Sequence, residues 1–590
     1  MVSPTNYDRP RLVGQPLLYA ISVFASLGVF LFGYDQGVMS GIITGPHFIE
    51  YFHAPGSVKI GSMVAVLEVG AFVTSLAAGR IGDIIGRKGT LFIGALVFTV
   101  GGAIQTFTSG FGVMVLGRVV SGFGVGLLST IVPIYQSEVS PPNHRGALAC
   151  AEFTGNIFGY AFSVWTDYFC SFIESDNAWR IPLFIQCIIG AILAAGSLFM
   201  PESPRWLIDT DKDEQGMKVL VDLHGGDPRD AGAKAEFQEI KDKVLMERNS
   251  GDGRSYGAMW RRYKRRILLA MSSQAFAQLN GINVISYYAR TSLTSPLHAP
   301  THWISAKVFE EAGWHGRQAL LMTGINAIIY TLSTLPPWYL VDRWGRRPIL
   351  LSGAAVMGLS LCATGWFMYL DREQTPGAVV VCVIVFNAAF GYRSVFVFWM
   401  LPASHPETSS CGWGPVPWLY PPEILPLTIR AKGVSLSTAT NWAFNTLVGE
   451  MTPYLQEVVE WRLYVMHGFF CGCSFVLVYF LYPETKGVPL EEMDVVFGDA
   501  EKIPLSGFPS PEHAALVARR GDSYPPSVGR RHPAHGWFGY LFGGNAGAKD
   551  LSSYQPIDGE EAEMERLRGD EEDAEGYEVL ERQSVPYVRP

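Results

Sequence analysis

A carboxyl group and a guanidinium group interrupt two long apolar stretches of this 590-residue chain. Asp35 follows Phe32-Gly33-Tyr34 inside or near the outer end of the first stretch, and Arg118 opens a glycine-rich one. A charged side chain inside a membrane is costly, so an acid at such a position is a functional candidate by default. Burial and a nearby guanidinium act on a carboxyl group in opposite senses, and their balance could let Asp35 bind and release a proton. A static Asp35–Arg118 pair that joins two helices is the alternative.

A second set of charges is repeated along the chain. The segment 79–88 (GRIGDIIGRK) reappears as 341–347 (VDRWGRR), with an aspartate four residues before an arginine and a glycine just ahead of that arginine. Each copy is followed by a glutamate and an arginine seven residues apart, which is too far for direct contact along one helix. We therefore expect contacts with the aspartate and arginine of the neighbouring loop, in a cytoplasmic gate that breaks when two halves move. Ordinary surface charge is the alternative. The proposed gate residues are Asp83, Arg87, Glu138, Arg145, Asp342, Arg346, Glu423 and Arg430.

Long apolar helices must position these charges. Hydrophobic residues make up 48% of the chain and charged residues 17%, which indicates an integral membrane protein. About twelve stretches approach the roughly 20 residues that a helix needs to cross a bilayer. We predict an all-α membrane protein with twelve transmembrane helices in two related six-helix bundles. The predicted spans are 17–39, 60–79, 90–107, 112–136, 149–169, 180–200, 266–289, 318–340, 348–369, 378–420 (broken), 434–455 and 463–482.

Loop charge predicts the orientation and the domain limits. Basic residues gather in alternate loops and the opposite loops are acidic, so the positive-inside rule places both termini and the central loop in the cytoplasm. We expect an N-terminal segment at 1–16, bundles at 17–200 and 266–482, a helical linker at 201–265 and a tail at 483–590. Within the linker, 231–247 has a helical pattern. The tail is rich in glycine, proline, serine and acids, which predicts that it is largely disordered.

The spacing of matching residues in the two copies shows that the second copy contains extra residues. Asp83 and Glu138 are 55 positions apart, whereas Asp342 and Glu423 are 81 apart, an excess of 26. Most of the excess fits 393–411, a polar, proline-containing stretch inside the broken tenth span. A second polar stretch, 290–307, follows the seventh span. Extracellular or re-entrant loops are one interpretation of these insertions, and translated introns are the one we favour.

Several motifs occur in a fixed order along the chain. They are 133–138 (PIYQSE), 201–207 (PESPRWL), 278–283 (QLNGIN), 415–418 (PVPW) and 483–487 (PETKG). Together they resemble the sugar porters of the major facilitator superfamily over roughly 17–497, and 152–156 (EFTGN) with 418–423 (WLYPPE) resembles the fungal members. The resemblance implies the major facilitator fold, alternating access and a substrate site near the membrane midplane between the two halves.

The resemblance also implies sugar-binding roles for several side chains. Amides offer donors and acceptors to hydroxyl groups, and an aromatic face can cover the apolar side of a sugar. Asn441 and Asn445 are one helical turn apart and could face one ligand. Hydrogen bonding between helices, the usual task of Asn and Gln in membranes, is the alternative. The implied substrate-binding residues are Gln278, Asn283, Asn326, Trp418, Asn441 and Asn445.

Two departures from the family pattern leave the substrate open. Ala277 precedes Gln278 where many members have paired glutamines, and Phe153 stands where a glutamine is common. Pentoses, polyols, disaccharides and sugar acids all stay possible. Residues of the same helix as Phe153 could supply substitutes, namely Glu152, Asn156, Tyr160 and Trp165.

In having an acid at Asp35 together with Arg118, the chain resembles the proton-coupled members of the family. We therefore expect a monomeric sugar or polyol transporter of the plasma membrane that works by proton symport. Facilitated diffusion, a non-transporting nutrient sensor on the same scaffold and a non-functional product that carries both insertions are the alternatives. The chain has no nucleophile–base set, phosphate loop or metal-ligand spacing, so we expect no enzyme activity, cofactor or nucleic-acid partner.

Overall fold

The computed structural model describes most of the chain between Leu12 and Phe497. The described residues are 12–43, 45–141, 145–249, 256–282, 284, 317–335, 338, 345–370, 375–391, 413–486, 488 and 493–497. They form α-helices joined by short loops, and this part of the chain contains no β-strand. A helix satisfies its own backbone hydrogen bonds, which a long apolar segment in a membrane requires. Both insertions, 290–307 and 393–411, lie outside the described residues, as do the first eleven residues and the tail beyond Phe497.

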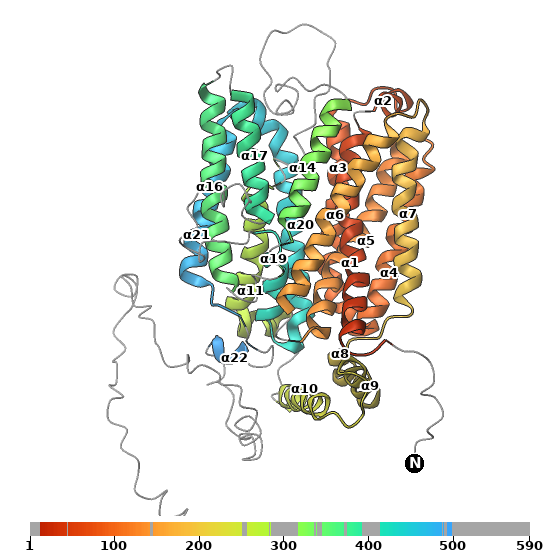
Figure 1. Ribbon diagram of the computed structural model, residues 1–590, viewed down its shortest axis with the longest axis vertical. Coiled ribbons are helices and arrows are strands. Elements are labelled where there is room, and N and C mark those ends of the chain that lie inside the picture. Colours follow the sequence, from red (N-terminus) through yellow and green to blue (C-terminus); the bar gives the residue numbers. More distant parts are fainter. Residues whose placement is uncertain are drawn as a thin grey trace, which may run out of the picture. The chain divides into compact units, whose positions relative to one another are not determined.

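The N-terminal half is coloured red to yellow in Figure 1. Its helices start and end within a few residues of the predicted spans for most elements. Helix α1 packs against α6, α4 packs against α5 and α7, and α3 packs against α5. The described elements of this half are α1 (Gln15–Ile42), α2 (Pro46–Tyr51), α3 (Ser57–Ile85), α4 (Arg87–Thr106), α5 (Phe111–Val139), α6 (Arg145–Cys170) and α7 (Asn177–Ser197).

Small residues hold α1 close to α6. Gly33 and Gly37 lie one turn apart on α1 and face α6. A Cβ atom at Gly33 would meet the backbone oxygen of Asn156, and one at Gly37 would meet the Ser163 hydroxyl. Small residues at this spacing allow helix backbones to come close in lipid. The contact fixes α1, and with it Asp35, against α6.

Three helices follow the first half in the chain. They are α8 (Pro204–Asp209), α9 (Asp213–Leu223) and α10 (Ala231–Asn249), and α10 covers the stretch with the predicted helical pattern. Ser203 caps α8 by accepting a hydrogen bond from the Trp206 N–H. The Gly14 N–H donates to the Asp222 carbonyl at 2.7 Å, which ties the start of α1 to α9. We call this end of the long helices the linker end.

The C-terminal half, coloured yellow-green to blue in Figure 1, contains the second set of long helices. Helix α16 packs against α17 and α21, and α11 packs against α20. The described elements are α11 (Tyr256–Leu279), α14 (Arg317–Ser333), α16 (Arg346–Leu370), α17 (Thr375–Gly391), α19 (Val416–Ile424), α20 (Leu427–Val459), α21 (Arg462–Leu481) and α22 (Met493–Val496).

Helix α11 begins earlier than its sequence predicts. The predicted start was residue 266, but the helix begins at Tyr256 and bends at Tyr263, whose φ of −113° and ψ of 20° are not helical. The basic cluster at 261–266 therefore lies within the helix and around its bend rather than in a loop. The bend lets a polar first segment lead into the apolar part of the helix. Lys and Arg are also good helix formers, which the loop assignment neglected.

A backbone hydrogen bond joins the two parts of the broken tenth span across the second insertion. Helix α17 ends at Gly391, and the next described residue is Trp413. The Gly414 N–H nevertheless donates to the Phe390 carbonyl at 2.9 Å. An α-helical hydrogen bond joins residues four apart, and these two are 24 apart in the chain. The two residues therefore make the backbone hydrogen bond of a continuous helix, although 20 more residues separate them in the chain than in such a helix.

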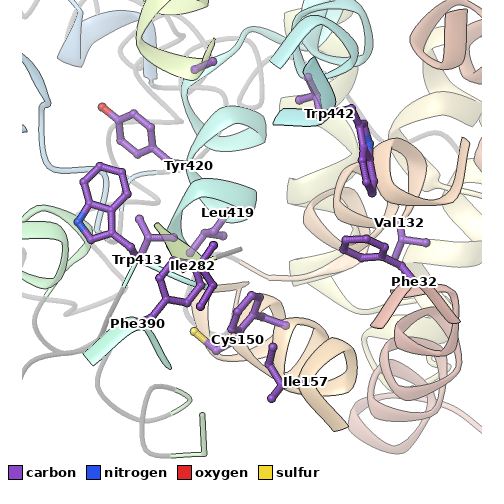
Figure 2. Packing of buried hydrophobic residues seen from close by; sticks show 14 of the residues in the cluster. Phe32, Val132, Cys150, Ile157, Ile282, Phe390, Trp413, Leu419, Tyr420 and Trp442 are labelled. Carbon is purple, nitrogen blue, oxygen red and sulfur yellow. The ribbon is translucent and has the colours of Figure 1, made fainter. Parts of the chain in front are cut away.

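The two halves meet along two pairs of helices, α3 with α20 and α6 with α14. Trp165 Nε1 on α6 donates to the Gly324 carbonyl on α14 at 3.2 Å. Between the halves, the Phe32 and Trp442 rings meet edge to face with centroids 5.0 Å apart. Figure 2 shows this pair beside Val132 within the buried apolar cluster. Seven of the described helices are long and apolar enough to cross a membrane.

Candidate functional site

Asp35 and Arg118 form a buried ion pair between two helices. Arg118 Nη1 on α5 lies 2.8 Å from each carboxylate oxygen of Asp35 on α1. The two residues are 1% and 2% exposed. Arg118 Nη2 also donates to the Val64 carbonyl of α3 at 3.2 Å. The pair therefore links α1, α3 and α5 at one point inside the N-terminal half.

Because this pair is buried, each charge is stabilised by the presence of the other. Taking both groups out of water is expensive, and their mutual attraction offsets that cost only while both are charged and in contact. Removing one charge leaves the other uncompensated, at a cost of about 3–5 kcal/mol. Protonation of Asp35 would therefore have to be accompanied by a rearrangement around Arg118.

A second buried ion pair lies at the linker end of the N-terminal half. Arg87, at the start of α4, donates from Nε and Nη2 to the two carboxylate oxygens of Glu138, at 2.9 Å each. The Ser203 hydroxyl donates to the same carboxylate at 2.6 Å. Arg87 Nη1 also reaches Asp83 Oδ1, one turn earlier, at 3.4 Å. Bidentate contacts between an arginine and a carboxylate are strong and directional.

The C-terminal half contains the same arrangement. Arg346, at the start of α16, donates from Nε at 3.2 Å and from Nη2 at 2.7 Å to the Glu423 carboxylate. The Thr485 hydroxyl donates to Glu423 at 2.7 Å, in the role that Ser203 has in the first half. The repeated charges therefore make matching contacts. Asp342 lies outside the described residues, and the Arg145 side chain is not described.

Each half also uses a second glutamate, whose role the sequence did not reveal. Glu202 accepts hydrogen bonds from the backbone N–H groups of Arg87 and Lys88 at the start of α4, at 2.9 Å and 3.2 Å. Glu484 accepts from the corresponding N–H groups of α16, at 2.8 Å and 3.0 Å. A carboxylate at a helix N-terminus satisfies free N–H groups and interacts favourably with the helix dipole. Burial nevertheless raises the pKa of Glu202, while the backbone hydrogen bonds oppose the rise.

The glycine ahead of each arginine explains why that motif is repeated. Gly86 and Gly345 have φ values of 88° and 97°, a region that side chains disfavour. A Cβ atom at either position would also meet the carboxylate of the capping glutamate. Glycine is therefore needed both to turn the chain into the helix and to admit Glu202 or Glu484.

Contacts between the halves gather at the linker end of α3 and α20. Lys432 Nζ lies 3.8 Å from Asp83 Oδ2, and the Asp83 side chain is 31% exposed. The Gly79 N–H donates to the Ser435 hydroxyl at 3.2 Å, and Ser435 also bonds the Ser75 carbonyl. Arg430 of α20 interacts electrostatically with Glu138 of α5. The strong buried pairs thus lie within each half, and weaker contacts join the halves.

The amides that the sequence singled out lie on several helices of the second half. Gln278 Nε2 on α11 donates to Asn441 Oδ1 on α20 at 2.7 Å. Asn441 Nδ2 is buried without a partner in the part of the chain that the structure describes. Asn445 is buried one turn further along α20, and Asn326 on α14 is half-buried. Asn283 lies outside the described residues. The structure joins Gln278 to Asn441 and keeps Asn441 and Asn445 buried on one helix.

A cavity lies between α1, α5, α6 and α19. Trp418 is the predicted binding residue that lines it. The rest of the lining comes largely from the N-terminal half. The full lining is Val29, Phe32, Ser129, Pro133, Gln136, Ser137, Ala149, Glu152, Phe153, Asn156, Trp418, Leu419 and Pro422.

The matching ion pairs of the two halves agree with comparisons to known proteins. The family model described as "Sugar (and other) transporter" matches residues 21–497, most of the chain. The chain belongs to this transporter family. The prediction from the sequence motifs is confirmed, and transport rather than catalysis is the family's activity.

Individual relatives cover nearly the same region. The transporter is 32% identical to the MFS-type transporter criB of Aspergillus cristatus, over 83% of this chain and 96% of that protein. It is 30% identical to a high-affinity glucose transporter of Kluyveromyces lactis, over 82% of this chain and 85% of the relative. The solved structure of the proton:xylose symporter XylE bound to 6-bromo-6-deoxy-D-glucose matches with a TM-score of 0.69 and 26% identity, over 81% and 98% of the two chains. The predicted major facilitator fold is confirmed.

In the transporter, both departures from the family pattern are buried. Phe153 lines the cavity, and its ring centroid lies 6.5 Å from that of Phe390 on α17. Ala277 is buried on α11 beside Gln278. Phe153 therefore replaces a polar wall by an aromatic one at this point. Of the substitutes considered from sequence, Glu152 and Asn156 line the cavity.

Proposed function

We propose that this transporter carries a sugar or polyol across the plasma membrane by alternating access, together with a proton that binds at Asp35. The observation that carries the proposal is the buried contact of Asp35 with Arg118, 2.8 Å from both carboxylate oxygens. A proton on Asp35 would cancel its charge attraction to Arg118, which joins α1 to α5, so proton binding and helix arrangement would be coupled. XylE, whose structure resembles this one, is itself a proton:xylose symporter.

The contacts at the linker end form two groups that would behave differently during the transport cycle. Each buried pair, Arg87–Glu138 and Arg346–Glu423, lies within one half and would move with it as part of a rigid body. The contacts of Asp83 with Lys432 and of Gly79 with Ser435 cross between halves and would break when this end opens. In this proposal the linker end faces the cytoplasm and is closed in the described conformation. The positive-inside distribution of charge supports that orientation.

Uptake measurements test the proposal. The full-length transporter is produced in cells that lack their own sugar carriers, and the cells receive labelled D-glucose, D-xylose, lactose, D-glucitol and glycerol. We expect accumulation of at least one compound above its external concentration, faster in acidic medium and abolished by a protonophore. Equilibration that ignores the protonophore would contradict proton coupling and leave facilitated diffusion. Normal surface expression without uptake of any compound would contradict transport and favour a sensor.

A further inference from the structure

A cluster of basic side chains near the start of α11 takes no part in the ion pairs described above. Five of the residues in 261–266 are basic, and they divide into two groups. The guanidinium groups of Arg262 and Arg266 lie over the Tyr263 ring, 5.3 Å and 5.5 Å from its centroid. Arg266 also lies over the Phe497 ring and is buried. These two side chains pack against the protein at the bend of the helix.

The other three basic side chains, Arg261, Lys264 and Arg265, are exposed. None of the three forms an ion pair with a carboxylate among the residues that the structure describes. Arg261 Nε donates to the Gly257 carbonyl of its own helix at 3.3 Å. Lys264 and Arg265 follow Arg261 by three and four residues, and like charges at this spacing repel one another. The surface therefore presents positive charge that an anion would neutralise.

Exposed apolar side chains flank this charge along α11. Trp260, directly before Arg261, is 45% exposed, and Leu268, four residues after Lys264, is 50% exposed. Tryptophan is enriched at the boundary between membrane and water, and an exposed leucine on a membrane helix suits contact with acyl chains. The basic groups therefore lie where a helix passes from lipid headgroups into the hydrocarbon.

The same part of α11 touches both halves of the transporter at the linker end. The Tyr256 hydroxyl donates to the Leu76 carbonyl on α3 at 3.3 Å, in the first half. Tyr256 also interacts electrostatically with Asp83, the residue that Lys432 contacts across the halves. A molecule bound to this part of α11 would therefore lie beside the contacts that join the halves.

We infer that Arg261, Lys264 and Arg265 bind the headgroups of anionic phospholipids in the leaflet at the linker end. Basic clusters directly outside a membrane helix attract phosphatidylserine and phosphoinositides. Guanidinium and ammonium groups donate charge-assisted hydrogen bonds to phosphate oxygens, while Trp260 and Leu268 would contact the lipid chains. In the proposed orientation this leaflet faces the cytoplasm and contains the anionic lipids, a point that rests on the proposed function. Basic residues that only set the topology would show no preference among lipids.

Native mass spectrometry of the purified full-length transporter in detergent tests the inference separately from transport. Phosphatidylserine and phosphatidylcholine with the same acyl chains are added in equal amounts, and the bound lipids are counted. We expect the wild type to prefer phosphatidylserine. The preference should fall about tenfold or more in the triple variant Arg261→Gln, Lys264→Gln, Arg265→Gln. Inorganic phosphate and phosphoserine, added at the same concentration, should not displace the lipid.

Two further variants separate this site from general charge and from misfolding. Lys218→Gln, Arg229→Gln, Lys234→Gln removes three exposed positive charges from the linker and should keep the wild-type preference. Arg261→Lys with Arg265→Lys conserves the charge and should keep most of it.

Four results would overturn the inference. They are equal binding of the two lipids by the wild type, an unchanged preference in the triple glutamine variant at 261, 264 and 265, an equal loss in the linker variant, and displacement of the lipid by the soluble phosphates. The last result would assign the cluster to a soluble anion. A selective lipid site in a protein without uptake would support the inference while contradicting transport, and uptake without lipid preference would do the reverse.

Discussion

Asp35 receives both of its short contacts from one nitrogen of Arg118, at 2.8 Å from each carboxylate oxygen. The second terminal nitrogen of Arg118 is turned to the Val64 carbonyl on another helix. A single proton on Asp35 would thus remove the charged partner of a guanidinium that bridges three helices. Protonation at this point can influence how α1, α3 and α5 pack, which is what coupling a proton to a conformational change requires.

The ion pair of Arg346 with Glu423 should contribute strongly to stability because both side chains are about 2% exposed. Arg346→Ala leaves a buried carboxylate unpaired and should destabilise the transporter by about 3–5 kcal/mol. Arg346→Met combined with Glu423→Leu removes both charges and should recover at least part of that loss. Denaturant unfolding of the purified variants in detergent measures both changes.

The matched control for that pair is Lys241 with Asp213, which lie 2.6 Å apart but are far more exposed. Lys241→Ala should change stability by about 1 kcal/mol or less, since solvent screens exposed pairs. Equal losses in Arg346→Ala and Lys241→Ala would show that burial does not strengthen the dependence on the pair. That result would count against the assignment of Arg346–Glu423 as a structural anchor of the second half.

The close approach of α3 to α20 predicts a conformational variant. A Cβ atom at Gly79 would meet the backbone oxygen of Ala431, whereas a Cβ atom at Gly61, on the same helix, would meet nothing. Gly79→Leu should therefore disfavour the state in which the linker end is closed. Overpacking costs about 1–3 kcal/mol, which shifts such an equilibrium roughly 5- to 150-fold.

Uptake and surface expression of the two leucine variants check this prediction. We expect Gly79→Leu to reach the surface and lose most uptake, and Gly61→Leu to transport like the wild type. Full activity of Gly79→Leu would mean that closure of α3 on α20 is not part of the cycle.

The sequence predicted the long helices well because a membrane leaves few alternatives to a helix and apolar length is easily counted. It also located Arg87 and Glu138, because the pattern recurs as Arg346 and Glu423. The capping roles of Glu202 and Glu484 were missed, since each carboxylate meets a helix start more than a hundred residues earlier in the chain. Local spacing carries no signal for such a contact. The bend of α11 at Tyr263 was missed for a different reason, as charged residues were taken to indicate a loop.

The hydrogen bond between Gly414 and Phe390 predicts that the second insertion is dispensable. Removal of residues 392–411, which are the insertion 393–411 and the residue before it, would place these partners four residues apart, as in a continuous helix. We expect the shortened transporter to reach the surface and to transport at least as well as the full chain. We also expect a transcript that lacks the corresponding codons, because we interpret the segment as a translated intron.

Two measurements check the interpretation of the insertion. Sequencing of the transcript shows whether the codons for 392–411 are present, and uptake by the shortened variant shows whether they are needed. The same test applies to 290–307. Transcripts that contain both segments in frame would contradict the intron interpretation, and loss of surface expression on shortening would show that residues 392–411 contribute to the fold.

Proton coupling through Asp35 is tested by comparing the wild type with Asp35→Asn in proteoliposomes, using whichever labelled sugar the wild type accumulates. Asparagine has nearly the shape of aspartate but cannot bind and release a proton. We predict that a pH gradient drives uphill accumulation by the wild type and that Asp35→Asn abolishes it. Sugar exchange without a gradient should persist in the variant, which shows that it is folded and binds substrate. Uphill, pH-driven accumulation that survives Asp35→Asn would contradict proton coupling through Asp35.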